Sequence, residues 1–139
     1  MFVYCLLCVL ACVVSFKDIT TRLISNKLCV LVLLVNGLFL IIYSQQWQGI
    51  IIAALVLLIG SYVLRLSLIG GGDVKLIASF CISLNGLDFI KAIYLSILIG
   101  GALSLYYLGK RIICKCDNGV PYGVAISIGF CIIIATYLK

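Results

Sequence analysis

Two aspartates, Asp18 and Asp73, are the residues of this chain best suited to carry out chemistry. The chain has 4 acidic residues among 139, and 65% of its sequence is hydrophobic. Keeping a carboxylate beside apolar membrane segments costs free energy, so an aspartate found there is interpreted first as functional. Asp73 also follows three glycines, in the sequence Gly70-Gly71-Gly72-Asp73. The pair is therefore the first candidate for a reactive site.

Two carboxylates that share one site near a low-dielectric medium cannot both ionise easily. Repulsion and desolvation make such a pair hold one proton between them and titrate as a unit. The ionised member can take a proton from an attacking water, while the protonated member donates to the carbonyl oxygen of a peptide bond. This acid–base arrangement is that of aspartic proteases, and it needs neither a metal ion nor a cofactor. We therefore predict that Asp18 and Asp73 are catalytic.

The glycine run favours this interpretation of the pair. For Asp18 alone, capping a loop or pairing with Lys17 or Arg22 is an equal alternative. Glycines permit positive φ angles and a close approach of the backbone to an extended peptide, whose groups would bond free amides. Small residues also let membrane helices pack closely, and this is the role that we expect for Gly100-Gly101.

The composition is that of an integral membrane protein. Charged residues make up 10% of the chain, against about 25% in soluble domains, and the mean hydropathy is +1.37. A helix needs roughly 20 apolar residues to span the bilayer. We expect an all-α, polytopic protein with one membrane-embedded domain, residues 1–139, and six transmembrane helices. Five segments are clear: Phe2–Phe16, Leu28–Tyr43, Ile50–Leu64, Ile90–Leu108 and Val120–Leu138. The fourth, Val74–Leu84, is short; the stretch from Ser67 onward would lengthen it, and a helix interrupted by glycines is favoured over a re-entrant loop.

The basic residues predict the orientation of these helices. Lys and Arg collect in short cytoplasmic loops, and with six spans eight of the 10 basic residues fall on one side. They are Lys17, Arg22, Lys27, Arg65, Lys75, Lys110, Arg111 and Lys115. Both termini are then non-cytoplasmic, and both candidate aspartates lie at the cytoplasmic face. The net charge of +6 reflects this orientation and attraction to the lipid bilayer; nucleic acid is not an expected partner.

The other acidic residues and the cysteines receive structural interpretations. Asp88 lies in an opposite loop, and Asp117-Asn118-Gly119 is typical of a turn. Cys5, Cys8 and Cys12 follow one helical face, and the Cys114-x-Cys116 pair lies across the membrane from Cys5, so the two groups cannot complete one tetrahedral metal site. We expect no metal site and no disulfide framework.

Three motifs resemble those of the type IV prepilin peptidases, membrane aspartic proteases of the Gly-x-Gly-Asp class. Gly70-Gly71-Gly72-Asp73-Val74-Lys75-Leu76 looks like the second catalytic motif. The segment from Asp18 to Asn26, with Arg22 and Ile24 at the expected spacings, resembles the first motif, Asp-x-x-x-Arg-x-Ile-Pro-Asn, although Ser25 stands where the family usually has proline. Pro121-Tyr122-Gly123 is similar to the Pro-Tyr-Gly motif that opens the last helix.

The resemblance implies an aspartic endopeptidase of the bacterial cytoplasmic membrane, with its active site facing the cytoplasm. It implies removal of a leader ending in Gly from type IV prepilins or pseudopilins, and the pilus assembly machinery as a partner. Long members carry a cytoplasmic Cys-x-x-Cys segment and methylate the new amino terminus; this chain resembles the short form of Flp-type, tight-adherence pili, and methyl transfer stays open. The supporting or substrate-binding candidates are Gly70, Gly71, Gly72, Lys75, Arg22, Asn26, Pro121, Tyr122 and Gly123. For Lys75, snorkelling to headgroups is favoured over contact with an oxyanion or substrate carboxylate.

Two other functions stay open at this point. A different Gly-x-Gly-Asp protease, of the signal-peptide or presenilin-like kind, would cut inside the membrane. A proton-coupled transporter or an assembly scaffold would use the aspartates as a proton relay, but a relay does not need three glycines immediately before its aspartate.

Overall fold

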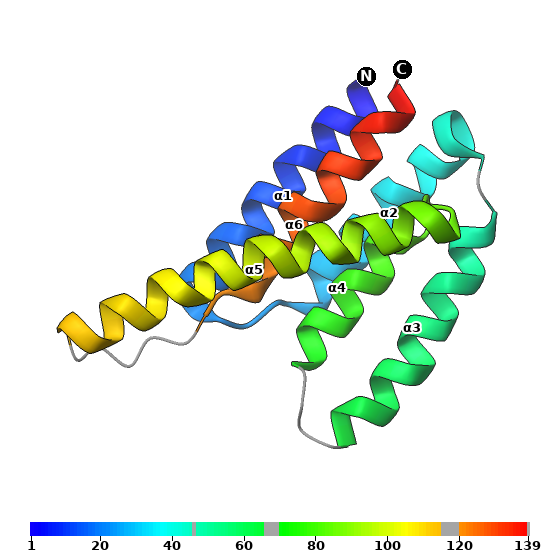
Figure 1. Ribbon diagram of the computed structural model, residues 1–139. Coiled ribbons are helices and arrows are strands. Elements are labelled where there is room, and N and C mark those ends of the chain that lie inside the picture. The colour runs from blue at the N-terminus through cyan, green and yellow to red at the C-terminus, as the bar shows by residue number, and fades with distance from the viewer. Residues whose placement is uncertain (46, 66–69, 115–119, 139) are drawn as a thin grey trace.

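Helices make up the fold of this protein in the computed structural model, which describes residues 1–45, 47–65, 70–114 and 120–138 (Figure 1). Six α-helices lie in these residues: α1 (Phe2–Thr21), α2 (Asn26–Phe39), α3 (Gln48–Arg65), α4 (Gly71–Cys81), α5 (Gly86–Cys114) and α6 (Tyr122–Ala135). A π-helical segment, Leu40–Ser44, continues α2, and a 3-10 turn, Thr136–Leu138, continues α6. The predicted all-α class is confirmed.

Four of these helical segments are long and apolar enough to cross a membrane: Phe2–Thr21, Asn26–Ser44, Gln48–Arg65 and Gly86–Lys110. The two remaining helices are shorter. With 11 residues, α4 is about 16 Å long, against a hydrocarbon layer of about 30 Å. Six full spans therefore stay a prediction, and the extension of the fourth segment from Ser67 lies outside the described residues.

The first helix continues past its predicted end at Phe16 and runs to Thr21. The hydroxyls of Thr20 and Thr21 donate back to the carbonyls of Phe16 and Lys17, each at 2.9 Å, so these polar side chains find partners on their own helix. Arg22 then ends the helix in the left-handed conformation, with φ 54°, as helix C-terminal residues often do. Asp18 consequently lies within the last helical turn.

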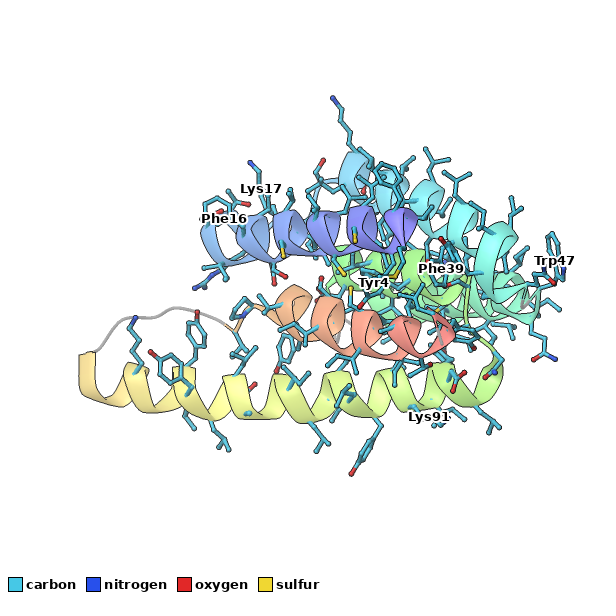
Figure 2. The ribbon with its side chains drawn as sticks, turned by 90° about the horizontal axis from the view of Figure 1, so that it is seen from above. Tyr4, Phe16, Lys17, Phe39, Trp47 and Lys91 are labelled. Carbon is cyan, nitrogen blue, oxygen red and sulfur yellow. The ribbon has the colours of Figure 1, made fainter. Side chains whose placement is uncertain are left out.

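The arrangement of the helices centres on α6. It packs along α1 and α5 and also contacts α4, while α2 and α3 cover the other sides of α4. Figure 1 shows α1 and α6 side by side, with both chain termini at one end of the bundle. Since the two helices are antiparallel, the last turn of α1 lies beside the first turn of α6. Figure 2 shows Lys17 near this end and Trp47 at the opposite end.

A polar network inside the bundle fixes α4 against α2. Asn36, which is fully buried, donates to the carbonyls of Ser79 and Phe80 at 3.0 and 2.7 Å and accepts from the Ser83 hydroxyl at 2.8 Å. Phe80 also stacks on Phe130 of α6, with ring centroids 5.6 Å apart. Buried polar groups that are satisfied in this way hold elements in a defined register, and α4 carries Asp73 at its other end.

Candidate active site

The last turn of α1 and the first turns of α4 and α6 meet at one cavity of about 270 Å³. The α1 turn contributes Asp18 and the α4 turn contributes Asp73, although the two residues are far apart in the sequence. The remaining lining residues come from the ends of the same helices and their adjoining loops: Arg22, Leu23, Ile24, Gly70, Gly71, Gly72, Val120 and Tyr122. The structure thus brings together the two predicted aspartates and five of the nine supporting candidates.

Asp18 is held by the start of α6. Its side chain is almost buried, with 6% of the residue exposed, and its Oδ2 accepts a hydrogen bond of 2.7 Å from the backbone N–H of Gly123. The first amides of a helix lack partners within the helix and carry partial positive charge. They therefore offset part of the cost of burying this carboxylate away from water.

Asp73 lies in the first turn of α4, outside the four candidate spans. Burial raises the pKa of its carboxyl group to about 6, and the neighbouring Asp18 carboxylate contributes to the rise. Both causes disfavour the ionised form, the first through lost solvation and the second through repulsion. The two aspartates therefore differ in environment, since Asp18 accepts a backbone hydrogen bond and Asp73 is the member that retains a proton more readily.

The three glycines do not take the conformations that the sequence predicted. No described glycine has positive φ; Gly70 is extended, with φ −70° and ψ 135°, and Gly71 and Gly72 begin α4. The prediction of positive φ is therefore wrong. What Gly70 and Gly72 supply is space: a Cβ on Gly70 would lie 3.0 Å from Asp73 Oδ2, and a Cβ on Gly72 would lie 3.1 Å from the Ile24 Cβ.

The short connection between α1 and α2 positions several groups of the site. Ser25 caps α2, with its Oγ accepting from the Lys27 N–H at 3.3 Å, so serine at this position starts the helix by a side-chain cap. Ile24 packs against the first turns of both α4 and α6. A Cβ on Gly72 of α4 would lie 3.1 Å from the Ile24 Cβ, and a Cβ on Gly123 of α6 would lie 3.1 Å from the Ile24 Cδ1. The sequence motif includes Ile24, but only the three-dimensional contacts show that it separates the starts of α4 and α6.

Lys75 and Asn26 join α4 to α2 beside the cavity. Lys75 Nζ donates to Asn26 Oδ1 at 2.9 Å, whereas the sequence favoured a lysine that snorkels to lipid headgroups.

At the start of α6, Pro121 is the residue before the first turn. The hydroxyl of Tyr122 lies 3.3 Å from that of Ser104, which connects α6 to α5.

Asp88 takes no part in this site. It lies in the first turn of α5, pairs with Lys91 at 2.8 Å and accepts a hydrogen bond of 2.6 Å from Tyr137. The predicted Asp117-Asn118-Gly119 turn and Cys116 lie outside the described residues. In the described part of α1, Cys5 and Cys12 are exposed and Cys8 is partly buried.

Comparison with known proteins assigns the chain to a family. Curated proteins and solved structures give no match. The model of the type IV leader peptidase family matches residues 5–105, a range that holds both cavity aspartates and most of the chain. The match ends before Pro121, so the contact between Gly123 and Asp18 comes from the structure alone. The chain belongs to the type IV leader peptidase family.

Proposed function

We propose that this protein is an aspartic endopeptidase that removes the leader peptide of type IV, Flp-like prepilins or pseudopilins at the cytoplasmic membrane boundary. Family membership implies protease activity. The observation that carries the aspartic mechanism is the single cavity lined by Asp18 and Asp73 at the ends of apolar helices. At the membrane boundary, the substrate bond that such a site would cut is the one that joins the polar leader to the apolar helix.

Asp18 is the proposed general base and Asp73 the proposed general acid. The Gly123 N–H bond supports an ionised Asp18, which takes a proton from water as the water oxygen bonds to the scissile carbon. Asp73 donates its proton to the carbonyl oxygen. When the C–N bond breaks, Asp18 passes its proton to the leaving amine, and Asp73 recovers its proton as the carbonyl re-forms. Both groups end as they began.

Charges at the same end of the bundle support a cytoplasmic site. Arg22 lines the cavity, Lys75 bonds beside it, and Lys17 lies near this end in Figure 2. Basic residues concentrate on the cytoplasmic side of membrane proteins. The leader of the substrate would then be cut before its apolar helix leaves the membrane.

Cleavage of a candidate prepilin by the purified, reconstituted protein tests this function. We expect one new amino terminus at the leader–helix boundary, identified by mass spectrometry, which also shows whether that terminus is methylated. A cut within the apolar helix would support an intramembrane protease of the Gly-x-Gly-Asp class instead. Failure to cleave any prepilin from the same organism would overturn the proposal.

Alanine substitutions at the three consecutive glycines are expected to have different effects on cleavage activity. Gly71→Ala should retain activity, because its Cβ would lie 3.7 Å from Leu64, an ordinary contact. Gly70→Ala and Gly72→Ala should lower kcat by about 10- to 10²-fold, since they crowd Asp73 and Ile24, and small displacements of catalytic groups have effects of this size. Steady-state cleavage of a prepilin measures all three. Equal activities would show that these contacts do not position Asp73.

The cleavage rate is expected to fall as the pH rises above about 6. The pKa of Asp73 is raised to about 6 by burial and by Asp18, so the proton that the general acid must donate is present below this pH and lost above it. A kcat/KM–pH profile gives the apparent pKa of the pair in the free protein. The Asp88→Asn variant should have the same profile; a rate that increases steadily with pH would assign the opposite role to Asp73.

A further inference from the structure

A second cavity, of about 640 Å³, opens beside the candidate active site and shares Gly70, Asp73 and Tyr122 with it. Its walls are α4 and α5, and its floor is α6. Both wall helices contact α6, but they make little contact with each other in the described residues. Figure 1 shows α4 and α5 joined by a short turn and diverging toward the first turn of α4, where Asp73 lies.

The polarity of this cavity changes along its length. Isoleucines line the part away from the aspartates, with Ile77 on α4, Ile93 and Ile97 on α5 and Ile126 on α6. Ser96 adds no free polar group there, because its hydroxyl donates to the Ala92 carbonyl at 2.8 Å. The polar groups, Asp73 and the adjacent Ser104 and Tyr122 hydroxyls, lie at the other end.

Two adjacent glycines in the middle of α5, Gly100 and Gly101, differ in what they contact. A Cβ on Gly100 would lie 3.4 Å from Tyr122 and 3.5 Å from Ala125, so this glycine serves the packing of α5 on α6. A Cβ on Gly101 would meet nothing within 4 Å, although Gly101 lines the cavity. The sequence predicted close helix packing for both glycines, but no helix of this chain packs against Gly101 in the described residues. The space beside Gly101 is open in the described part of the chain.

We propose that this cavity, called here the helix groove, binds the apolar helix of the substrate and sets the bond beside Asp73. The inference rests on the proposed function and adds the surface that recognises the substrate. The groove is continuous with the catalytic cavity, and its order of polar and apolar walls matches a chain that is polar before the cut and apolar after it. Small wall residues let a helix backbone approach closely.

The length of the groove limits how many residues of the substrate helix can bind in it. From Ile93 to Ser104 the α5 wall extends about 16 Å, which corresponds to roughly three turns of a bound helix. The residues immediately after the cut therefore bind here, and the rest of the substrate helix lies in lipid. Prepilins whose leaders differ in length would be cut at the same boundary, because binding of the substrate's apolar helix, and not of its leader, sets the cleavage position.

Filling the groove at Gly101 tests this proposal. Gly101→Leu should raise KM for prepilin cleavage by at least about tenfold, because the added side chain occupies the space of the substrate, and should leave kcat nearly unchanged, since only binding is lost. Ala102→Leu, at an exposed neighbouring position of α5, is the matched control and should leave both constants unchanged. Equal effects of the two variants, or a fall in kcat at unchanged KM, would overturn the role of the groove.

Photocrosslinking with the unmodified protein provides a second test that does not depend on a variant. A prepilin with a photoreactive leucine analogue in the first turns of its apolar helix should crosslink to the groove residues of α5 and α6. Crosslinks to the outer faces of α2 and α3, or to lipid alone, would overturn the proposal while normal cleavage upholds the proposed function. If the protein cleaves no prepilin, the proposed function itself fails.

Discussion

Replacing either Asp18 or Asp73 by asparagine is expected to lower prepilin cleavage by at least about 10³-fold, because general acid–base catalysis by one positioned group contributes about 10²- to 10⁴-fold and each step here requires both groups. Asparagine keeps the shape of the side chain but can neither take nor donate the proton. The double variant should be no slower than the single variants, as residues that act as a unit are strongly non-additive. Single-turnover cleavage in detergent or vesicles measures the loss.

Asp88→Asn is the matched control for these variants. Asp88 pairs with Lys91 and accepts a hydrogen bond from Tyr137, and it does not line the catalytic cavity. Its substitution should therefore leave the cleavage rate unchanged. Membrane insertion and the thermal unfolding temperature should be measured for all three variants, so that a loss of activity is separated from a loss of fold. Full processing by Asp18→Asn or Asp73→Asn would refute the catalytic pair.

Gly123→Ala is expected to lower kcat by about 10²-fold, although it adds only a methyl group, because a displacement of about 1 Å in a catalytic group has an effect of this size. The new Cβ would lie 2.8 Å from Asp18 Oδ2 and 3.0 Å from Asp18 Cγ. A carbon atom cannot approach a carboxylate so closely, so Asp18 must move away from the Gly123 N–H that it now accepts at 2.7 Å. The proposed base loses both its position and the hydrogen bond that favours its ionised form.

Gly109→Ala provides the comparison for this effect. A Cβ on Gly109 would meet nothing within 4 Å, and alanine favours a helix over glycine. Its activity should equal that of the unmodified protein. If Gly123→Ala cleaves as fast as Gly109→Ala, Asp18 is not held through Gly123, and the assignment of Asp18 as the base loses its structural support.

Local features of the chain were predictable because they depend on nearby residues. The apolar runs predicted the helices but misplaced several ends: α1 continues past Phe16 to Thr21, and α5 extends beyond the predicted Ile90–Leu108 at both ends, from Gly86 to Cys114. The rarity of aspartate and the Gly-rich run before Asp73 singled out the two carboxyl groups, since an acidic residue in an apolar chain is costly wherever the chain folds. The side of the membrane that the site faces and the catalytic roles stay predictions.

What the sequence determined by itself is an all-helical membrane protein with two candidate aspartates, because composition and helical spacing are properties of the chain. What only the tertiary structure decided is which groups touch them. The N–H of Gly123 bonds Asp18 across 105 positions, Gly70 and Gly72 supply space but Gly71 does not, and Gly101 faces an open groove. These outcomes depend on distances between helices, which no local pattern encodes.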